Sequence, residues 1–338
     1  MKLKVGKKVD PKKFKLGQIE DTKKLHKRTA NLIKSYALKA DVILNSCYLC
    51  GEKLPDGSFV TIYNFDYSFC SSCGHLSGKK RLSDQNLQKY YQENLDYSKT
   101  YTDATQIQYR LKNIAQPKVK FVMEHIKQPK EGVWLDVGCA IGDVVKVVEE
   151  YENWSAIGCD ISKPSIEMGR KLFNIDLRQE NISDFLGKNP RLLFDVVSFF
   201  GYFAVTSSPL KDMELAVKHL KKHGYIVVGD SNADSFSTII QKSYPEFSTR
   251  HILPPNTTHQ FTKKSIEYIF KKFGITPIAY WNFGLDFFEL LKYLSLMNNS
   301  FQDTPLCNFL MENLNEFQKV IDKKCMGDYF IVIGQKTK

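Results

Sequence analysis

The sequence predicts an α/β fold with a doubly wound, mostly parallel sheet, preceded by a small cysteine-rich module and a helical segment. From about residue 130 onward, apolar strand-like runs alternate with amphipathic helical runs. Such alternation requires parallel strands joined by helices that cover both faces of the sheet. A turn rich in small residues follows the first of these strands, and two CxxC pairs lie upstream.

Each element has its own signal. Apolar runs predict strands, in order, at 132–137, 155–160, 193–200, 225–230, 275–281 and 328–336. Helical periodicity predicts helices at 142–151, 163–173, 212–223, 262–273, 287–297 and 306–323. Ser162 precedes a proline at the start of one helix, while Gly224 and Gly274 are expected to end two others. A ligand is expected at the carboxyl ends of the strands.

The basic charge of the chain is concentrated at its N-terminus. Residues 1–40 carry 12 lysines and one arginine against three acidic residues, which accounts for ten of the eleven net positive charges. We therefore expect a basic arm over 1–40, disordered up to residue 18 and helical from 20. The arm either binds phosphates or is a solubilising tail. A cysteine module over 41–80, a helical segment over 81–128 and an α/β domain over 129–338 with a helical C-terminal insertion follow.

Targeting signals are not evident in this sequence. The basic N-terminus has no apolar stretch typical of a secretory signal. The best candidate for a membrane span, "LLFDVVSFFGYFAV", is short and contains Asp195. These observations predict a cytoplasmic protein without a membrane span.

Four cysteines in the module have metal-ligand spacing. Cys47 and Cys50 form one CxxC pair, and Cys70 and Cys73 form a second one after 19 intervening residues. Two such turns direct four thiolates at one tetrahedral ion, so we expect a structural Zn²⁺ with no open coordination position. Disulfides and an iron–sulfur cluster are the alternatives. His75 is expected to be a surface residue rather than a ligand, and the remaining four cysteines to be buried thiols.

The turn "WLDVGCAIGD" (134–143) follows a strand and opens a helix, as a nucleotide-binding turn does. Gly138 can adopt a positive φ, and small residues at Ala140 and Gly142 let the backbone approach a ligand closely. Asp160 ends the next strand, 24 residues after Asp136, where a carboxylate can accept hydrogen bonds from both ribose hydroxyls.

"LDVGCAIGD" followed by "IGCDIS" resembles the first two motifs of class I S-adenosylmethionine-dependent methyltransferases, which have a Rossmann-like fold. Ala140 stands where that family usually has the middle glycine. The resemblance implies a methionine-binding turn, a ribose-binding strand end and an adenine-binding pair. The cofactor-binding residues expected there are Asp136, Gly138, Cys139, Ala140 and Gly142, then Asp160 and Ile161, then Asn181 and Ile182. Phe199 stands at a strand end where it can line the cofactor, although phenylalanines in strands are usually core.

A narrower resemblance covers almost the whole chain. The cysteine module, "YYQENLDYSKTY", the run from Arg110 to Lys118 and the catalytic domain look like bacterial methyltransferases of sugar and polysaccharide biosynthesis. This resemblance implies a sugar or nucleotide-linked sugar as acceptor. It also suggests that Tyr97 and Tyr101 cover the methionine end of the cofactor, although tyrosines there can equally pack a helix against the sheet.

The acceptor atom depends on the base that the chain offers. The sugar C-methyltransferases usually carry a Glu-His pair after the fourth strand, and Ala204 and Val205 occupy those positions here. O-methylation is therefore slightly favoured. His259 is the main candidate base, because histidine titrates near neutrality, with Tyr202 and His251 as weaker candidates. A loop histidine can instead be a structural hydrogen-bonding residue.

Two other functions stay open at this point. The zinc module and basic arm could hold RNA for methylation, and binding would then weaken steeply with salt. The nearly neutral body and the lack of an Asn/Asp-Pro-Pro-aromatic motif count against this alternative. A non-catalytic scaffold that binds S-adenosylmethionine is the other. The apolar helical stripe within 283–301 indicates core or a homodimer face.

Overall fold

The computed structural model describes residues 1–338 apart from 10–18, 94–103, 248–249, 299 and 338. Its main feature is an eight-stranded sheet, in which only β14 runs antiparallel to its neighbours. In spatial order the strands are β1 (Lys2–Val5), β13 (Ile275–Phe283), β14 (Tyr329–Lys336), β11 (Leu220–Ser231), β10 (Phe194–Phe200), β7 (Gly132–Val137), β8 (Trp154–Cys159) and β9 (Leu177–Arg178).

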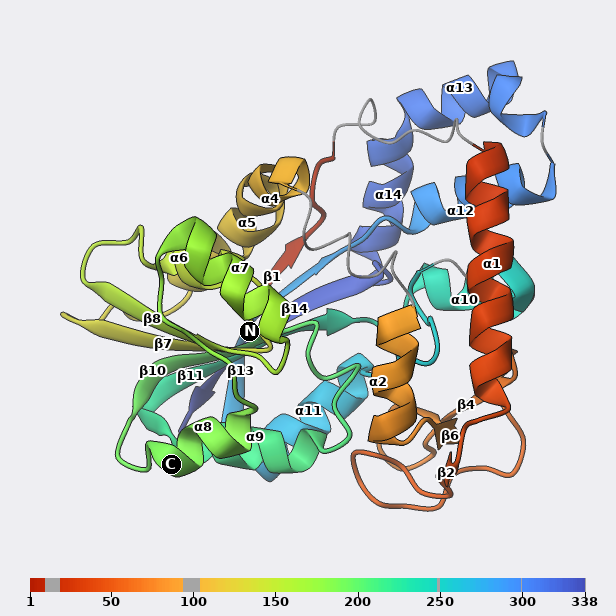
Figure 1. The fold of residues 1–338 in the computed structure, drawn as a ribbon. Helices are drawn as coiled ribbons and strands as arrows, with labels where there is room; N and C mark the ends of the chain where they lie inside the picture. The colour runs from red at the N-terminus through yellow and green to blue at the C-terminus, as the bar shows by residue number, and fades with distance from the viewer. Residues whose placement is uncertain (10–18, 94–103, 248–249, 299, 338) are drawn as a thin grey trace.

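Helices cover both faces of this sheet (Figure 1). One face carries α5 (Gln116–Met123), α6 (Asp143–Val148) and α7 (Lys163–Phe173), and the other carries α8 (Ile182–Lys188), α9 (Pro209–Lys218) and α11 (Lys263–Lys272). Both faces of β7 are buried under these helices. The neighbouring residues Trp134 and Leu135 are fully buried, but they belong to core clusters on opposite faces of the sheet. A strand buried on both faces needs a continuous apolar run, which is the pattern of the sequence.

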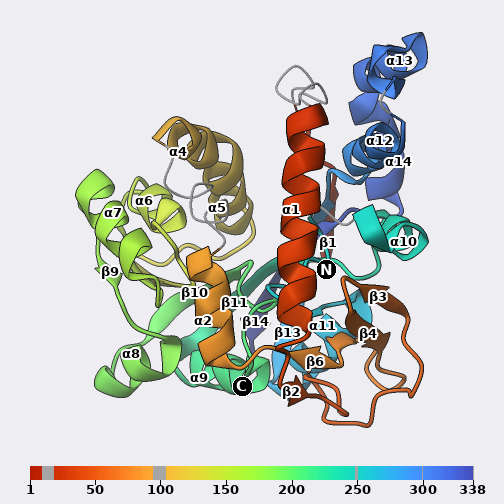
Figure 2. The ribbon, with the colours of Figure 1, turned by 45° about the vertical axis from the view of Figure 1, so that its right-hand side comes forward.

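The cysteine module forms two small antiparallel sheets. β2 (Val42–Ile43) pairs with β6 (Lys80–Arg81), while β3 (Val60–Ile62), β4 (Phe65–Phe69) and β5 (Leu76–Gly78) form a meander. A two-residue strand from the C-terminal half of the chain, β12 (His259–Gln260), adds to β5. Figure 2 shows the module below the long helix α1 (Ile19–Ala37), with α2 (Asp84–Glu93) beside it. The module thus shares a sheet with a segment that lies almost 200 residues further along the chain.

The remaining helices lie at the carboxyl end of the sheet. The helical segment continues through α4 (Ala104–Arg110) and a π-helical turn (Leu111–Ala115) into α5, which has Pro117 in its first turn. Further helices are α10 (Phe236–Ser243), α12 (Asp286–Met297), α13 (Pro305–Glu312) and α14 (Leu314–Lys323), with 3₁₀ turns at Pro245–Phe247 and Phe301–Asp303. None of the helices described has the length and apolarity needed to cross a membrane.

Two predictions about local structure are wrong. Residues 2–5 are a strand rather than disordered, because they pair in parallel with residues 279–282 of β13 and Lys4 lies 4.0 Å above the Trp281 ring. Gly224 does not end a helix, since α9 ends at Lys218 and β11 begins at Leu220, which pairs with Phe194. The apolar residue Leu220 fits either periodicity, and strand pairing decides between them.

Candidate functional site

The turn between β7 and α6 has the geometry expected of a ligand-binding turn. Gly138, Ala140 and Gly142 all have positive φ, at 71°, 49° and 79°. A Cβ on Gly138 would lie 2.7 Å from Cδ2 of Tyr202, and one on Gly142 would lie 2.7 Å from Cδ1 of Ile175. Larger side chains would therefore displace neighbours as well as strain the backbone.

Two carboxylates flank this turn at the ends of adjacent strands. Asp136 is buried and accepts a hydrogen bond from Ser198 Oγ at 2.5 Å; burial raises its pKa to about 7. Asp160 accepts the Ala140 N–H at 2.9 Å and the Ser162 N–H at 2.8 Å, one on each oxygen. Each Asp160 oxygen keeps a second lone pair for a ligand hydroxyl. The chemistry of this cradle fits the ribose and amino-acid parts of a nucleoside cofactor.

The other predicted cofactor residues differ in exposure. Asn181 caps α8 by accepting the Asp184 N–H, which commits its side-chain oxygen to the protein. Ile161 is 75% exposed at the end of β8, so it is open to a ligand, whereas Ile182 and Phe199 lie in the core. Cys139 is buried as well. The structure thus brings the turn and the strand ends together, while Tyr97 and Tyr101 lie outside the described residues.

Tyr202 follows β10 and packs against the glycine turn. Its hydroxyl donates to Asp212 Oδ2 at 3.0 Å, and Thr206 Oγ1 donates to the same oxygen at 2.7 Å. Burial and the neighbouring Asp212 raise the pKa of Tyr202. The phenol therefore keeps its proton at neutral pH, and in this structure Tyr202 shapes the wall of the site rather than offering a base.

A buried histidine pair joins the cysteine module to this loop. His259 and His75 have no exposed surface, and His75 Nε2 lies 2.8 Å from His259 Nδ1. His259 Nε2 donates to the Thr206 carbonyl at 3.1 Å, so its Nδ1 must accept from His75. Burial lowers the pKa of His259 to about 4. Both nitrogens of His259 are thus occupied by protein groups and hold loop and module together.

The prediction that His75 lies on the surface is wrong. It is fully buried, and its Nδ1 lies 3.3 Å from Ser265 Oγ at the start of α11. The contact with His259 spans 184 residues of sequence, so spacing could not reveal it. His251 is also buried, with Nε2 bonded to Thr238 Oγ1 at 2.8 Å and Ser235 Oγ at 3.0 Å, and burial lowers its pKa to about 3.

The four module cysteines converge. Their sulfur atoms all lie within 4.8 Å of one another, with Cys47 and Cys73 at 3.6 Å and Cys50 and Cys70 at 3.4 Å. Tetrahedral zinc with bonds of about 2.3 Å places its sulfurs roughly 3.8 Å apart, so the set fits such an ion. Gly51 and Gly74 follow each pair with positive φ and donate back to the Cys47 and Cys70 carbonyls.

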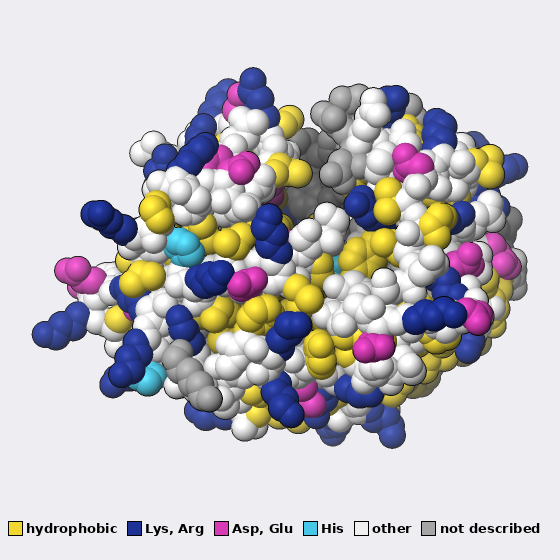
Figure 3. Space-filling model, turned by 90° about the horizontal axis from the view of Figure 1, so that it is seen from below, with side chains coloured by type: hydrophobic (Ala, Val, Ile, Leu, Met, Phe, Trp, Pro, Cys, Tyr) yellow, Lys and Arg dark blue, Asp and Glu magenta, His cyan; other side chains and the backbone are white. Residues whose placement is uncertain are grey.

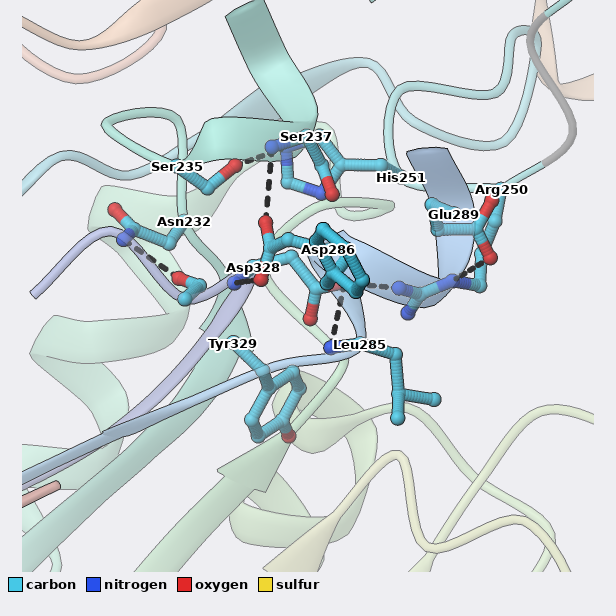
Figure 4. A network of polar contacts seen from close by, with 12 residues as sticks. Asn232, Ser235, Ser237, Arg250, His251, Leu285, Asp286, Glu289, Asp328 and Tyr329 are labelled. Atoms are coloured by element: carbon cyan, nitrogen blue, oxygen red, sulfur yellow. Dashed lines mark hydrogen bonds and ion pairs between the residues drawn. The ribbon is translucent and has the colours of Figure 1, made fainter. Parts of the chain in front are cut away.

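A carboxylate cluster lies where β13 ends and β14 begins (Figure 4). Asp286 accepts N–H groups from Ser237 and Asp328, which ties α10 and β14 to α12. Arg250 pairs with Asp328 and, at 3.0 Å, with Glu289. Gln318 of α14 bridges the cluster to a further carboxylate by donating to Asp286 and Asp322.

Comparisons with known proteins agree with this geometry. The model of the family described as "Methyltransferase domain" matches residues 104–280, a little over half of the chain. An uncharacterized protein from Rickettsia prowazekii, RP028, is 24% identical over 217 residues, which cover 60% of this chain and 74% of that protein.

Solved structures are similar at lower identity. A SAM-dependent methyltransferase from Archaeoglobus fulgidus is 15% identical with a TM-score of 0.47, covering 69% of this chain and all of its own. The plantazolicin methyltransferase BamL, solved in complex with a triazolic desmethylPZN analog and SAH, is 15% identical with a TM-score of 0.44; 76% of this chain and all of that one are covered.

Proposed function

The chain belongs to the methyltransferase domain family, and from that premise we propose that this S-adenosylmethionine-dependent enzyme methylates a sugar or nucleotide-linked sugar. One observation supports the activity above all others. The positive-φ turn at Gly138 and the carboxylates Asp136 and Asp160 meet at the carboxyl ends of adjacent parallel strands, where open α/β sheets bind their ligands.

Different residues of the chain are assigned to different parts of the cofactor. We propose that Asp160 binds the ribose hydroxyls, that the turn from Asp136 to Gly142 surrounds the methionine part, and that Ile161 and Ile182 flank the adenine. Asn181, Cys139, Ala140 and Phe199 complete the proposed lining, and Tyr97 and Tyr101 stay candidates for the methionine end. The bound cofactor supplies an electrophilic methyl group, and the chain must align the acceptor with it.

Charge and loop composition support a small acceptor and transfer to oxygen. Outside residues 1–40 the chain is nearly neutral, which is unlike a surface that follows a phosphate backbone. On the face seen in Figure 3, Lys and Arg side chains are scattered among acidic and apolar ones. Ala204 and Val205 stand where sugar C-methyltransferases usually carry Glu and His, so carbon methylation would lack its usual base.

We also propose that Cys47, Cys50, Cys70 and Cys73 hold one structural Zn²⁺. All four ligands come from the protein, so no position stays open for a substrate or a catalytic water. Metal analysis should find about one zinc per chain, and Cys47→Ser should lower that content to near zero. An undiminished zinc content in this variant would exclude Cys47 as a ligand.

The cofactor site is tested by Asp160→Ala. We expect S-adenosylmethionine affinity to fall at least about 100-fold in calorimetry, because two hydrogen bonds to a charged group contribute roughly 3 kcal/mol or more. Circular dichroism should show an unchanged fold. Asp176→Ala is the matched control, because Asp176 is a partly exposed carboxylate directly before β9. Unchanged affinity in Asp160→Ala would remove Asp160 from the ribose site.

The acceptor class is tested with methyl-labelled S-adenosylmethionine and a cell extract divided into small-molecule, glycan and nucleic-acid fractions. Label in nucleotide sugars or glycans supports the proposal. Label in RNA would contradict it and would give the basic residues of the N-terminal segment a role. Cofactor binding without label in any fraction favours the non-catalytic scaffold.

A further inference from the structure

The amine of Lys118 occupies an unusual place at the carboxyl edge of the sheet. Lys118 lies in the first turn of α5, and its Nζ is 4.7 Å from the centre of the Phe200 ring and 5.2 Å from that of Tyr329. Phe200 ends β10, directly before the Gly201–Tyr202 turn, and Tyr329 begins β14. Gly229 makes room for both rings, since a Cβ there would lie 2.6 Å from Phe200.

Charged groups surround this amine without pairing with it. Arg110 of α4 and Asp143 of α6 form their own ion pair at 3.1 Å, and Lys7 donates to a carbonyl of the π-helical turn. Asp136 of β7 is bonded to Ser198. Within the described part of the chain, Lys118 Nζ has no hydrogen bond or ion pair, only the two aromatic faces. Burial lowers its pKa to about 8, with Arg110 and Lys7 acting in the same direction and Asp143 and Asp136 against it.

Other candidate bases at this edge are already engaged. His259 uses both ring nitrogens, Tyr202 donates to Asp212, and His251 Nε2 is hydrogen-bonded to Thr238 of α10. A general base needs a free lone pair within reach of the acceptor and a pKa near the working pH. The Lys118 amine has no hydrogen-bond partner among the described residues, and it lies beside Phe200 at the end of β10, two residues before Tyr202 of the site.

We propose that Lys118 is a catalytic residue, whose neutral amine takes the proton of the acceptor hydroxyl while the aromatic faces of Phe200 and Tyr329 bound the acceptor. This inference rests on the proposed methyl transfer to oxygen. As the hydroxyl oxygen bonds to the methyl carbon, the carbon–sulfur bond breaks and its electron pair stays on sulfur. The hydroxyl proton passes to Nζ, and the resulting ammonium returns it to solvent.

The first test requires no acceptor. In protein labelled with [13Cε]-lysine, one signal that Lys118→Arg removes should titrate near pH 8, whereas exposed lysines titrate above pH 10. If that signal instead titrates above pH 10, as the signals of exposed lysines do, the proposal is overturned. S-Adenosylmethionine affinity is measured on Lys118→Met and Lys118→Arg by calorimetry. We expect changes below threefold, and a tenfold loss would assign Lys118 to the cofactor instead.

The second test uses whichever extract fraction the wild-type protein labels. Lys118→Arg keeps a cation but has no accessible neutral form, so transfer should fall at least about 100-fold. Lys120→Met is the control, because Lys120 is exposed two residues further along α5. If Lys118→Arg transfers methyl groups as fast as the wild type, with the same pH profile, Lys118 is not the base. Absence of label with wild-type protein would instead count against the proposed function.

Discussion

The histidine pair (His75 and His259) and the carboxylate cluster (Arg250, Asp286, Glu289, Asp322 and Asp328) attach different accessory parts to the same sheet. The pair joins the cysteine module to the loop after β10 through neutral, fully buried rings. The cluster joins α10, α12 and α14 to the start of β14 through buried carboxylates and the half-exposed Arg250. Protonation of a buried histidine destabilises the neutral connection, whereas loss of one member of an ion pair destabilises the charged connection.

The largest expected effect is in the charged connection. Arg250→Met leaves Asp328 and Glu289 buried without the arginine; their side chains are 3% and 6% exposed. We expect the free energy of unfolding to fall by roughly 2–3 kcal/mol, less than for a fully buried pair, because the Arg250 side chain is 43% exposed and Lys292 still reaches Glu289. Urea unfolding measures the loss. Arg178→Met, which breaks an exposed pair with Asp176, is the control and should cost less than about 1 kcal/mol.

A smaller effect is expected in the neutral connection. His259→Phe keeps a ring to stack on Tyr48 but leaves His75 Nε2 and the Thr206 carbonyl without partners. Stability should fall by about 1–3 kcal/mol at pH 7.5. Amide exchange should accelerate in residues 202–206 more than in α12, and equal acceleration in both would mean that the pair does not act locally.

The same variant should change the response to acid. The folded protein holds the pKa of His259 near 4, whereas the unfolded chain protonates at its ordinary value near 6.5. The stability that a neutral His259 supplies is therefore complete above about pH 6.5 and is lost as the pH falls towards 4. Unfolding of His259→Phe, followed from pH 7.5 to 4.5, should show a shallower decline than wild type.

The smallest effect is expected at Asp322 and has the opposite pH dependence. Burial raises the pKa of Asp322 to about 7, so the ionised form costs stability increasingly as the pH rises from about 4 to 7. Asp322→Asn can still accept from Gln318, and should stabilise the protein by about 1–2 kcal/mol at pH 8 but little at pH 4. This gain is smaller than the roughly 4 kcal/mol of the full pKa shift, because an amide oxygen accepts a weaker hydrogen bond than a carboxylate. Equal effects at both pH values would contradict a buried charge. Asp303→Asn, on the surface, is the control.

The sequence predicted those features whose residues lie close together in the chain, and it did not predict contacts between residues that are far apart in the chain. The turn at Gly138, the strand end at Asp160 and the four cysteines could be read because each pattern spans a few residues or one βαβ unit. The histidine pair could not, since only β12 pairing with β5 brings His259 beside His75. Lys118 stood in a run noted only for its resemblance; its aromatic neighbours come from β10 and β14, over 80 residues later.

The strand formed by Lys2–Val5 also has a consequence for synthesis on the ribosome. It can be added to the sheet only after β13 is in place, and β13 is itself held on its other side by β14. β1 is therefore translated long before its partner and is among the last strands to be paired, because that partner lies some 277 positions downstream. Deletion of residues 2–5 should leave the folding of the inner strands unaffected while exposing the edge of β13, a surface on which nascent chains can pair wrongly.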